Sequence, residues 1–369
     1  MRSGYDCYAI TAPGIEPVTA RELAAHGLAS TAVEPGGVAF RATTAGLYAA
    51  NLELRTASRV LVRVGSFHAS AFHELERRAK RLLWDRFLAP GSTPEFRVTS
   101  RKSKLYHQDA VAERLGEAAG RGREREGAGA TQLFVVRFFR DECTVSADSS
   151  GDLLHRRGYR LDTGTAPLRE TLAAAMLLES GWDGRAPLAD PFCGSGTIPI
   201  EAALIARRIA PGLRRGFAFE GWPELDLRVW DGLTEAARAR VLDRARGPIV
   251  GADRDEAAIA AARGNAERAG VAEDVALRRA VMSAFEPPAP AGHLVTNPPY
   301  GVRVGERAKV RGLYVRLGEV VRTRCPDWRV TMLSPQRALE HATGLPFESR
   351  LLTTNGGIRV RLVTAGVRG

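Results

Sequence analysis

An α/β protein with a mostly parallel sheet in its C-terminal part is the fold class that the sequence predicts, on three observations. From about residue 163 onward, short apolar strands alternate with helical stretches, which is typical of a parallel sheet with helices on both faces. A glycine-rich turn, CGSG at residues 193–196, directly follows one of these strands. The 369 residues, of which 44% are hydrophobic and 26% charged, are enough for two or three globular cores.

Net charge and cysteine usage narrow the class of protein. The formal charge of +11 would attract phosphate polymers, but nearly all the basic residues are arginine, so a compositional bias explains the charge equally well. With neither an apolar N-terminal run nor a stretch of about eighteen apolar residues, we expect no signal peptide and no membrane span. The cysteines are far apart and form no CxxC pair, which indicates a reducing cytoplasm rather than disulfides or a zinc site: Cys7, Cys143, Cys193 and Cys325.

Two smaller units are expected before the parallel sheet. In residues 1–65, the strand-like runs YAIT, GGVAFRA and SRVLVRVG surround a helical stretch from Ile15 to His26, which predicts an α+β unit. Residues 66–160 contain a long helical segment, FHELERRAKRLLWDRFL, and the strands EFRVTS, QLFVVRFF and CTVSADSS. The Gly/Arg-rich stretch at 120–130 indicates a mobile loop.

Residues 161–369 are expected to form the parallel sheet. The strands PLADP, PIVGAD, VALRRAV, HLVTN and WRVTMLS alternate with helical stretches, and a hairpin through ESRLLTTNGGIRVRLVTA ends the chain. Further helices are expected near 310–323 and from Gln336. In this alternation HLVT is the fourth strand, adjacent to the strand that ends at Asp190. Ligands of such sheets bind beyond the carboxyl ends of the strands.

The first candidate site is the turn between Asp190 and Thr197. Gly194 and Gly196 allow a tight turn and the close approach of a ligand. The turn is neither a phosphate loop, because no Lys follows Gly196, nor a complete G-x-G-x-x-G pattern. A GxG alone also fits a plain strand–helix turn. The carboxylate of Asp190 favours a ligand, because it can hold a cationic amine.

A second carboxylate follows the next strand. Asp253 in GADRD stands where an acidic residue accepts the hydroxyls of a ribose. The alternative for this stretch is a helix cap, which Asp255 can provide. A cationic amino acid attached to a ribose, bound in the crevice of an α/β sheet, describes S-adenosylmethionine.

The stretch VTNPPYGVR, from Val295 to Arg303, gives the predicted chemistry. Methylating an exocyclic amine on a base requires hydrogen-bond acceptors aimed at its two N–H bonds. The side-chain carbonyl of Asn297 and the backbone carbonyl of Pro298 are suitable acceptors, held by a stiff loop. Tyr300 can stack on a flipped base. A rigid turn without chemistry is the alternative.

These motifs resemble a known family. DPFCGSGT, GADRD and NPPYG stand in the order of class I S-adenosylmethionine-dependent amino-methyltransferases. SSGDLLHRRGYR (149–160) and APLRETLAAA (166–175) resemble the junction between a THUMP domain and its methyltransferase. The chain is similar to the guanine-N2 methyltransferase half of the bacterial 23S ribosomal RNA enzyme L, and to related tRNA enzymes. The resemblance implies a Rossmann-like methyltransferase domain with a seven-stranded sheet, preceded by ferredoxin-like (1–65) and THUMP (66–160) modules.

The resemblance also implies roles for single residues. Asn297, Pro298 and Tyr300 would hold the target guanine. One departure from the family is that VMS stands at 281–283 where an acidic residue usually meets the adenine, so the contact would pass to Ser283 or a backbone carbonyl. The implied cofactor-binding residues are Asp190, Phe192, Cys193, Gly194, Ser195, Gly196, Thr197, Asp253, Arg254, Met282 and Ser283, with Glu170 and Thr171 closing over the methionine end.

An RNA-binding surface is expected in the N-terminal half. A basic cluster with an aromatic neighbour in RKSKLY suits phosphate contacts and base stacking, and a solvated loop is the alternative reading. Basic residues of the junction present the same choice. The expected RNA-binding residues are Arg101, Lys102, Lys104, Tyr106, Arg156, Arg157 and Arg160.

The sequence thus favours a monomeric, cytoplasmic enzyme that uses S-adenosylmethionine, with 23S ribosomal RNA or tRNA as its partner and no metal or membrane. Three alternatives stay open. A DNA adenine-N6 methylase and a methylase of protein glutamine side chains both use the NPPY motif. A non-catalytic RNA-binding or ribosome-assembly protein is the third, because of the missing acidic residue near Val281.

Overall fold

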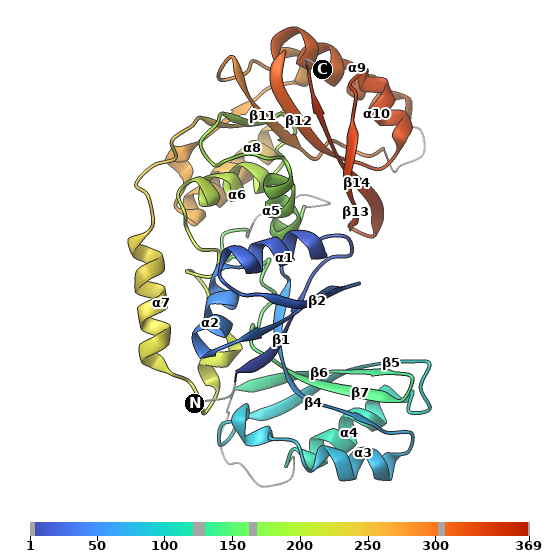
Figure 1. Cartoon of the computed structure of the whole chain (residues 1–369). Helices are drawn as coiled ribbons and strands as arrows, with labels where there is room; N and C mark the ends of the chain where they lie inside the picture. The colour runs from blue at the N-terminus through green and yellow to red at the C-terminus, as the bar shows by residue number, and fades with distance from the viewer. Residues whose placement is uncertain (1–3, 121–129, 162–167, 302–306, 368–369) are drawn as a thin grey trace.

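The computed structural model describes residues 4–120, 130–161, 168–301 and 307–367. The molecule is elongated, with a sheet formed by the N-terminal residues at one end and a sheet formed by the C-terminal residues at the other (Figure 1). The predicted mobile loop at 120–130 lies almost wholly outside the described residues. Within the described part of the chain, no helix combines the length and the apolar character that a membrane crossing requires.

The first half of the chain forms one continuous seven-stranded sheet. The predicted boundary at residue 65 falls inside β4, which pairs with β1 through residues 59–62 and with β7 through residues 61–68. The two predicted N-terminal units therefore share a hydrogen-bonded sheet. Its strands, in spatial order, are β2 (Ser30–Glu34), β3 (Gly37–Ala42), β1 (Tyr5–Ile10), β4 (Arg59–His68), β7 (Glu142–Asp148), β6 (Thr131–Phe139) and β5 (Thr93–Arg101).

The helices of this half differ in part from expectation. The predicted Ile15–His26 helix is confirmed as α1 (Glu16–Ala25). The segment expected as one long helix ends early, as α3 (Phe72–Ala79), because the Trp84 indole donates a hydrogen bond to the Ala79 carbonyl and Trp84 is buried. A short 3₁₀ turn, η1 (Trp84–Arg86), follows. The remaining helices are α2 (Thr44–Glu53), which was not predicted, and α4 (Gln108–Ala118).

The second half forms the expected mostly parallel sheet with an antiparallel terminal hairpin. The predicted fourth strand, β11, lies beside the strand that ends at Asp190, β8, as expected. The strands in spatial order are β10 (Val275–Arg279), β9 (Ile249–Asp253), β8 (Leu188–Asp190), β11 (Ala291–Thr296), β12 (Asp327–Ser334), β14 (Ile358–Gly366) and β13 (Glu348–Asn355).

Helices cover both faces of this sheet. One apolar cluster joins the strands to α5 (Glu170–Glu179), α6 (Thr197–Ala206) and α8 (Glu256–Ala269). Another cluster joins them to α9 (Arg307–Arg324) and α10 (Arg337–Thr343). The short turns are η2 (Ala218–Gly221), η3 (Ala272–Asp274) and η4 (Met282–Ala284), and α7 (Leu227–Ala239) lies apart from the sheet (Figure 1).

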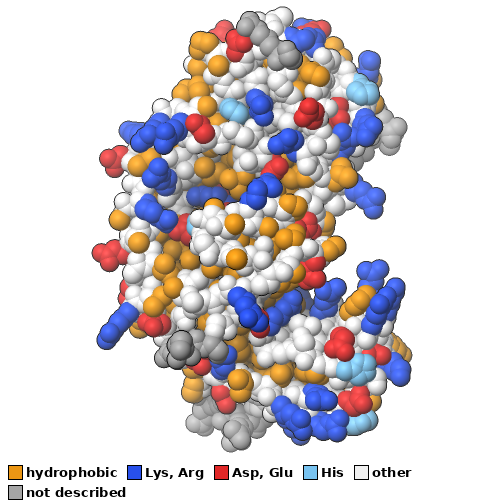
Figure 2. Space-filling model, viewed as in Figure 1, with side chains coloured by type: hydrophobic (Ala, Val, Ile, Leu, Met, Phe, Trp, Pro, Cys, Tyr) orange, Lys and Arg blue, Asp and Glu red, His pale blue; other side chains and the backbone are white. Residues whose placement is uncertain are grey.

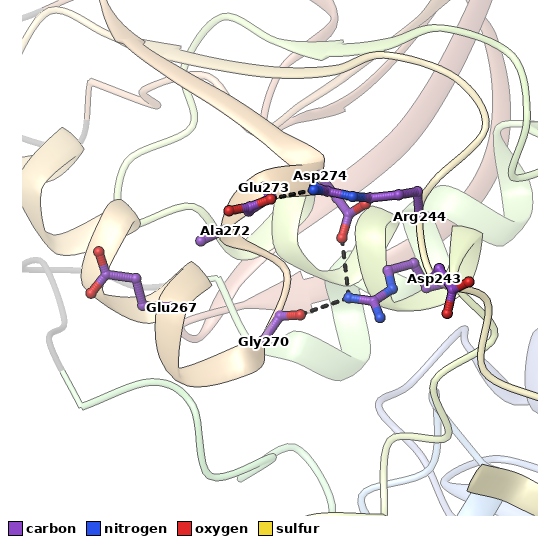
Figure 3. Close-up of a pocket in the computed structure, with 8 residues that line it drawn as sticks. Asp243, Arg244, Glu267, Gly270, Ala272, Glu273 and Asp274 are labelled. Carbon is purple, nitrogen blue, oxygen red and sulfur yellow. Dashed lines mark hydrogen bonds and ion pairs between the residues drawn. The ribbon is translucent and has the colours of Figure 1, made fainter. Parts of the chain in front are cut away.

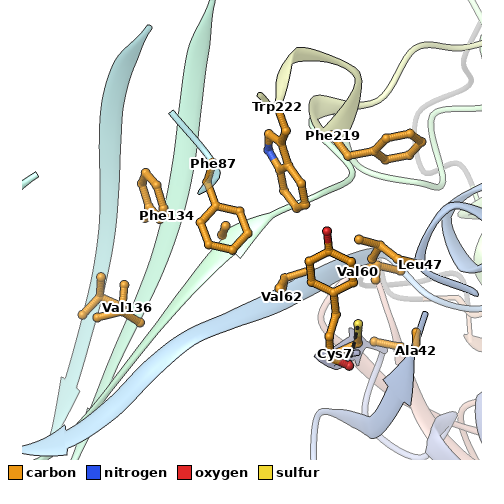
Figure 4. Close-up of a cluster of buried hydrophobic side chains, with 14 of the residues drawn as sticks. Cys7, Ala42, Leu47, Val60, Val62, Phe87, Phe134, Val136, Phe219 and Trp222 are labelled. Carbon is orange, nitrogen blue, oxygen red and sulfur yellow. Dashed lines mark hydrogen bonds between the residues drawn. The ribbon is translucent and has the colours of Figure 1, made fainter. Parts of the chain in front are cut away.

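Residues that precede α7 pack into the core of the N-terminal half. Phe219 stacks on Tyr48 of α2 with a centroid distance of 4.3 Å, and the Trp222 indole donates to Gln132 of β6 at 2.7 Å. Figure 4 shows Phe219 and Trp222 in the same apolar cluster as Val60 and Val62 of β4. The segment between α6 and β9 therefore ties the C-terminal half to the N-terminal sheet.

A second contact between the halves joins the loop before α1 to the terminal hairpin. Ile15 and Val18 belong to the same apolar cluster as Val360 and Leu362 of β14. Gly14 lies so close to β13 that a Cβ there would be 1.7 Å from the Leu352 carbonyl oxygen. Because Gly14 also has a φ of +85°, only glycine fits this contact.

We expect Gly14→Ala to loosen this contact. Gly91 offers a matched control, because it has the same φ of +85° and nothing lies within 4 Å of its added Cβ. Gly91→Ala should cost only the left-handed backbone strain, about 1–2 kcal/mol. Gly14→Ala should cost about 1–3 kcal/mol more, from overpacking against the hairpin. Urea denaturation measures both, and equal losses would show that the Gly14 contact adds no specific stability.

Candidate active site

The glycine turn follows the buried end of β8. Gly194 and Gly196 have φ values of +51° and +86°, and a Cβ on Gly196 would lie 3.0 Å from the Ala262 Cβ of α8. The Asn265 side chain of α8 donates to the Ser195 carbonyl at 3.0 Å. The turn is thus pressed against α8, and α6 begins at Thr197 directly after it.

Asp190 is a buried carboxylate at the start of this turn, 2% exposed. Burial raises its pKa to about 7, and the neighbouring Asp253 adds to the rise, while hydrogen bonds from Thr296 and the Phe192 amide oppose it. The described residues make both of these hydrogen bonds to Oδ1, from the Thr296 hydroxyl at 2.6 Å and from the Phe192 N–H at 3.1 Å. Neither of these two hydrogen bonds uses the other oxygen, Oδ2.

Asp253 ends the adjacent strand β9, and its carboxylate organises both turns. Oδ2 accepts from the Gly194 N–H at 3.0 Å, and Oδ1 accepts from the Asp255 N–H at 3.0 Å. Asp255 caps α8 by accepting from the Ala257 N–H, which confirms its predicted role. Asp253 keeps lone pairs for further donors, and the Arg254 side chain is exposed beside it.

The segment after β10 holds Val281, Met282 and Ser283, which were predicted to lie near the adenine. The Ala280 N–H donates to the Asp253 carbonyl, which brings this segment against the end of β9. The 3₁₀ turn η4 buries Met282, whereas Val281 is 51% exposed and Ser283 is exposed. The predicted contact of Ser283 with the adenine stays a prediction.

The NPPY loop leaves β11 next to Asp190. The last residue of β11, Thr296, is the donor to the Asp190 carboxylate, so the two loops are joined by a direct hydrogen bond. Asn297 and Tyr300 are half-buried, and Pro298 is buried. The structure therefore places the predicted acceptors and the predicted cofactor turn at one edge of the sheet.

Tyr300 links this loop to the terminal hairpin. Its hydroxyl donates to the Asn297 side-chain oxygen at 2.6 Å and accepts from the Asn355 side-chain amide at 2.9 Å. Burial raises the pKa of Tyr300 to about 12, so the phenol stays protonated and remains a donor. The carbonyl predicted to meet the substrate amine is thus fixed by a neighbour.

The junction residues are mostly structural. Arg157 is buried: its guanidinium donates to the carbonyls of Leu154 and Arg55, and its Nε lies 3.6 Å from Glu201. The prediction that Arg157 binds RNA is therefore wrong, because its charge is used inside the protein. Only Arg156 of this group is exposed.

Glu170 is held by the last arginine of the junction. Arg160 pairs with Glu170 at 3.1 Å and donates to the Leu168 carbonyl, which directs it inward and away from an RNA-binding role. Burial raises the pKa of Glu170 to about 7, although Arg160 opposes the rise. Thr171 is buried beside Glu170, and the adjoining residues 166–167 of the predicted closing segment lie outside the described residues.

The basic loop after β5 is exposed and braced. The side chains of Arg101, Lys102, Lys104 and Tyr106 are all exposed. The Lys104 N–H donates to the Asp141 carboxylate at 2.7 Å, which ties the loop to the turn between β6 and β7. The structure thus brings the four together at the end of β5 and on the loop that follows it, and their RNA contact stays a prediction. Figure 2 shows Lys and Arg side chains on both sides of the hollow between the two ends of the molecule.

A cavity of about 470 Å³ lies elsewhere, at the beginning of β9 and β10 (Figure 3). That is the opposite edge of the sheet from the NPPY loop. Arg207 pairs there with Asp274 and Arg244 with Glu273, and two further acidic residues, Asp243 and Glu267, line the cavity. The cavity is thus separate from the edge that carries Asp190 and Asn297.

Two residues of the site were not found from the sequence. Thr296 was read only as the end of an apolar strand, and Asn355 only as part of the hairpin turn. Their partners lie 106 and 55 residues away in the chain, so no local pattern points to them. An Asn directly before two glycines in a turn was the one available signal.

Two family models match the chain. The methyltransferase domain UPF0020, described as RMKL-like, matches residues 157–359, and the RlmL ferredoxin-like domain matches residues 6–61. The ferredoxin-like expectation for the N-terminus is thereby confirmed. The THUMP interpretation of residues 66–160 stays a prediction.

Curated relatives match nearly the whole chain. "Putative RNA methyltransferase slr0064" of Synechocystis is 35% identical over 365 residues, covering 96% of this chain and 95% of that protein. "Putative RNA methyltransferase YpsC" of Bacillus subtilis is also 35% identical, covering 95% and 93%. "Ribosomal RNA large subunit methyltransferase K/L" of Syntrophotalea carbinolica is 36% identical over 96% of this chain, which spans only 52% of that protein.

Solved structures share the whole fold. SMU.472, described as "a putative methyltransferase complexed with SAH", has a TM-score of 0.91 at 31% identity, with full coverage of both chains. "A predicted N6-adenine-specific DNA methylase" from Listeria monocytogenes has a TM-score of 0.88 at 33% identity, covering 98% and 96%. With a methyltransferase model over most of its C-terminal part and relatives along its full length, this chain belongs to the UPF0020 family of RMKL-like methyltransferases.

Proposed function

We propose that this protein is an RNA methyltransferase that transfers a methyl group from S-adenosylmethionine to the exocyclic N2 amine of a guanosine. A structured region of 23S ribosomal RNA is the favoured substrate, and tRNA is the next. The observation that carries the proposal is the hydrogen bond between Thr296 and Asp190, which holds the acceptor loop directly beside the cofactor turn. The names of the relatives as RNA methyltransferases support the substrate class.

The residues at the carboxyl edge of the sheet fit S-adenosylmethionine. Asp190 has one oxygen to offer a cationic amine, and its raised pKa means that such a cation would stabilise its ionised form. Asp253 suits a ribose, and the glycines leave room for close approach. When bound, the cofactor supplies an electrophilic methyl group on a positively charged sulfur. The SAH complex of SMU.472 supports this choice.

The acceptor loop would prepare the target amine. The lone pair of an exocyclic amine is delocalised into the base, so the nitrogen is a weak nucleophile. Acceptors on both N–H bonds favour a pyramidal nitrogen whose lone pair is free to attack. The Asn297 side-chain oxygen and the Pro298 carbonyl would supply them, fixed in advance by the proline and by Tyr300.

Methyl transfer from labelled S-adenosylmethionine to total RNA of a strain lacking this protein, followed by nucleoside analysis, tests the proposal. Label in N2-methylguanosine supports it, and fractionation of large ribosomal RNA and tRNA identifies the substrate. Label in N6-methyladenine of DNA would favour a DNA adenine methylase, the activity for which the Listeria protein is named. Binding of the cofactor and of RNA without transfer would favour a non-catalytic ribosome-assembly role.

We expect Asn297→Ala to lower methyl transfer by a factor of about 10²–10³, or roughly 2.7–4 kcal/mol, because a preorganised acceptor is lost. Asn297→Asp should lose less, because a carboxylate keeps acceptor oxygens for both Tyr300 and the amine. Single-turnover rates at saturating RNA measure the effect. Cofactor affinity serves as the control for folding, and an unimpaired Asn297→Ala rate would exclude the proposed role.

Cofactor affinity should depend on pH through Asp190. With its pKa raised to about 7, the carboxyl is protonated below that pH and must release a proton to pair with a cation. Affinity should therefore fall by up to about tenfold for each pH unit below about 7. Calorimetric titration over roughly pH 5.5–7 measures this. Asp190→Asn should bind more weakly with little pH dependence, and a wild-type profile that is flat over this range would contradict the assignment.

The same raised pKa has a consequence for stability. Because the folded pKa lies above the ordinary value of 3.8, protonation of this carboxyl stabilises the folded state, and the contribution is present in full below about pH 3.8 and is lost as the pH rises to about 7. The free energy of unfolding should therefore be measured at each pH at which the cofactor affinity is measured, so that the two pH dependences can be told apart.

Removing Lys102 and Lys104 should weaken RNA binding uniformly across sequences. Each lost phosphate contact should lower the slope of log affinity against log salt by about 0.7–0.9. Lys102→Gln/Lys104→Gln therefore should bind less tightly and with a shallower slope. Arg228→Gln/Arg238→Gln on α7 is the charge-matched control, since both side chains are exposed. Equal effects of the two pairs would indicate attraction by net charge alone.

A further inference from the structure

Asn355 sits at the tip of the terminal hairpin. It ends β13 and pairs across the turn with Ile358, and the two residues between them, Gly356 and Gly357, have φ values of +56° and +83°. Two central residues with positive φ are the mark of a type I′ turn, which fixes the register of a hairpin. The position of Asn355 is therefore set by the backbone of the hairpin.

The tip reaches past the edge of the sheet where the NPPY loop lies. Arg361 of β14 pairs with Ser334, the last residue of β12, so residues 358–360 extend beyond the end of that strand. β12 is parallel to β11, and the ends of both strands lie at the same edge. Asn355 thus arrives beside the loop that follows β11, although it lies 55 residues from Tyr300 in the chain.

The hydrogen bonds between the hairpin and the loop run in one direction. The Asn355 side-chain nitrogen can only donate, so it occupies a lone pair of the Tyr300 oxygen at 2.9 Å. The single phenolic proton is then given to the Asn297 oxygen at 2.6 Å. While the Asn355 nitrogen faces the phenol, a turned-over Asn297 amide would place its NH₂ against the phenol, and the phenolic proton would have no acceptor among these three side chains. With Asn355 as the donor, the chain of hydrogen bonds therefore selects the orientation of Asn297.

The apolar surroundings hold this chain in place. Tyr300 packs against the same cluster as Leu351 and Ile358 of the hairpin, to which Ile15 of the N-terminal half also belongs. Gly14 lies against the backbone of Leu352 on the same strand. The N-terminal half thus contacts the same hairpin strand that ends at Asn355.

We propose that Asn355 is a positioning residue, which acts through Tyr300 to keep the Asn297 carbonyl turned toward the target amine. The proposal rests on the proposed function of the NPPY loop. It assigns to the hairpin a part in the methyl-transfer step, and it assigns to the Tyr300 hydroxyl a role beyond the stacking expected of its ring.

The kinetic test separates rate from binding. Asn355→Ala should lower kcat by roughly tenfold, the effect of one lost hydrogen bond in a buried chain, with the KM for RNA and the affinity for S-adenosylmethionine nearly unchanged. Asn355→Asp, of the same shape, should lose at least as much, because an ionised carboxylate cannot donate and would draw the phenolic proton away from Asn297. Thr354→Ala, at an exposed position on the same strand, is the control and should keep the wild-type rate.

A double-mutant cycle distinguishes positioning from general support of the hairpin. If Asn355 acts through the phenol, Asn355→Ala should have almost no further effect on kcat in a Tyr300→Phe background. Equal effects in both backgrounds, or loss of RNA affinity instead of kcat, would overturn the proposal. A lower melting temperature with an unchanged kcat would overturn it as well.

A measurement without substrate keeps the inference separate from the proposed function. In ¹⁵N spectra, the side-chain amide signal of Asn297, identified by its absence in Asn297→Ala, should move in Asn355→Ala and stay in place in Thr354→Ala. An unmoved signal in Asn355→Ala would overturn the inference while leaving the proposed function intact. If the wild type methylates DNA or protein instead of RNA, the proposed function fails, and the same kinetic cycle is run on that substrate.

Discussion

The hydrogen bond between the Thr296 hydroxyl and the Asp190 carboxylate is the interaction on which the rest of the site depends. Both residues are buried, and they end two neighbouring parallel strands, β11 and β8. Burial disfavours the charge of Asp190, and the nearby carboxylate of Asp253 adds to this effect. Thr296 and the Phe192 amide offset part of that cost and fix the direction of the carboxyl group. The loop that would hold the substrate therefore begins from the group that would hold the cofactor.

Two of the contacts between the methyltransferase half and the N-terminal half lie far apart in sequence. The loop before α1 packs against the terminal hairpin, where Gly14 leaves no room for a larger residue. The segment at 217–222 reaches from the C-terminal half into the N-terminal half, where its aromatic rings are buried in the core. The NPPY loop is joined to this hairpin by the hydrogen bond from Asn355 to Tyr300.

Much of the fold could be predicted because its signals are local. The alternation of strands and helices, the glycine turn, the Asp255 cap and the terminal hairpin all lie within short stretches of sequence. The α2 helix was missed because its apolar positions gave no clear period, and β2 because all five of its residues are exposed. β2 is a strand through its pairing with β3, and α2 packs beside the sheet.

The site was predicted unevenly for the same reason. Asp190, Asp253 and Asn297 come together because strand order alone places them at one edge. Charge in the sequence does not reveal exposure, so Arg157 looked like its neighbour Arg156 although Glu201, 44 residues later, faces it in the interior. Hydrogen bonds between side chains far apart in the chain, such as that of Asn355 with Tyr300, produce no periodic pattern in the sequence and could not be predicted from it.

The continuous N-terminal sheet has one further consequence. Because β4 pairs with β1 at one end and with β7 at the other, the basic loop after β5 and the α1 side of the sheet cannot swing independently. The loop that would bind RNA is thus joined by hydrogen-bonded strands to the surface that packs against the terminal hairpin. In the proposed reaction the protein would select a nucleotide by its fixed distance from the RNA segment bound at the basic loop, rather than by the sequence around that nucleotide.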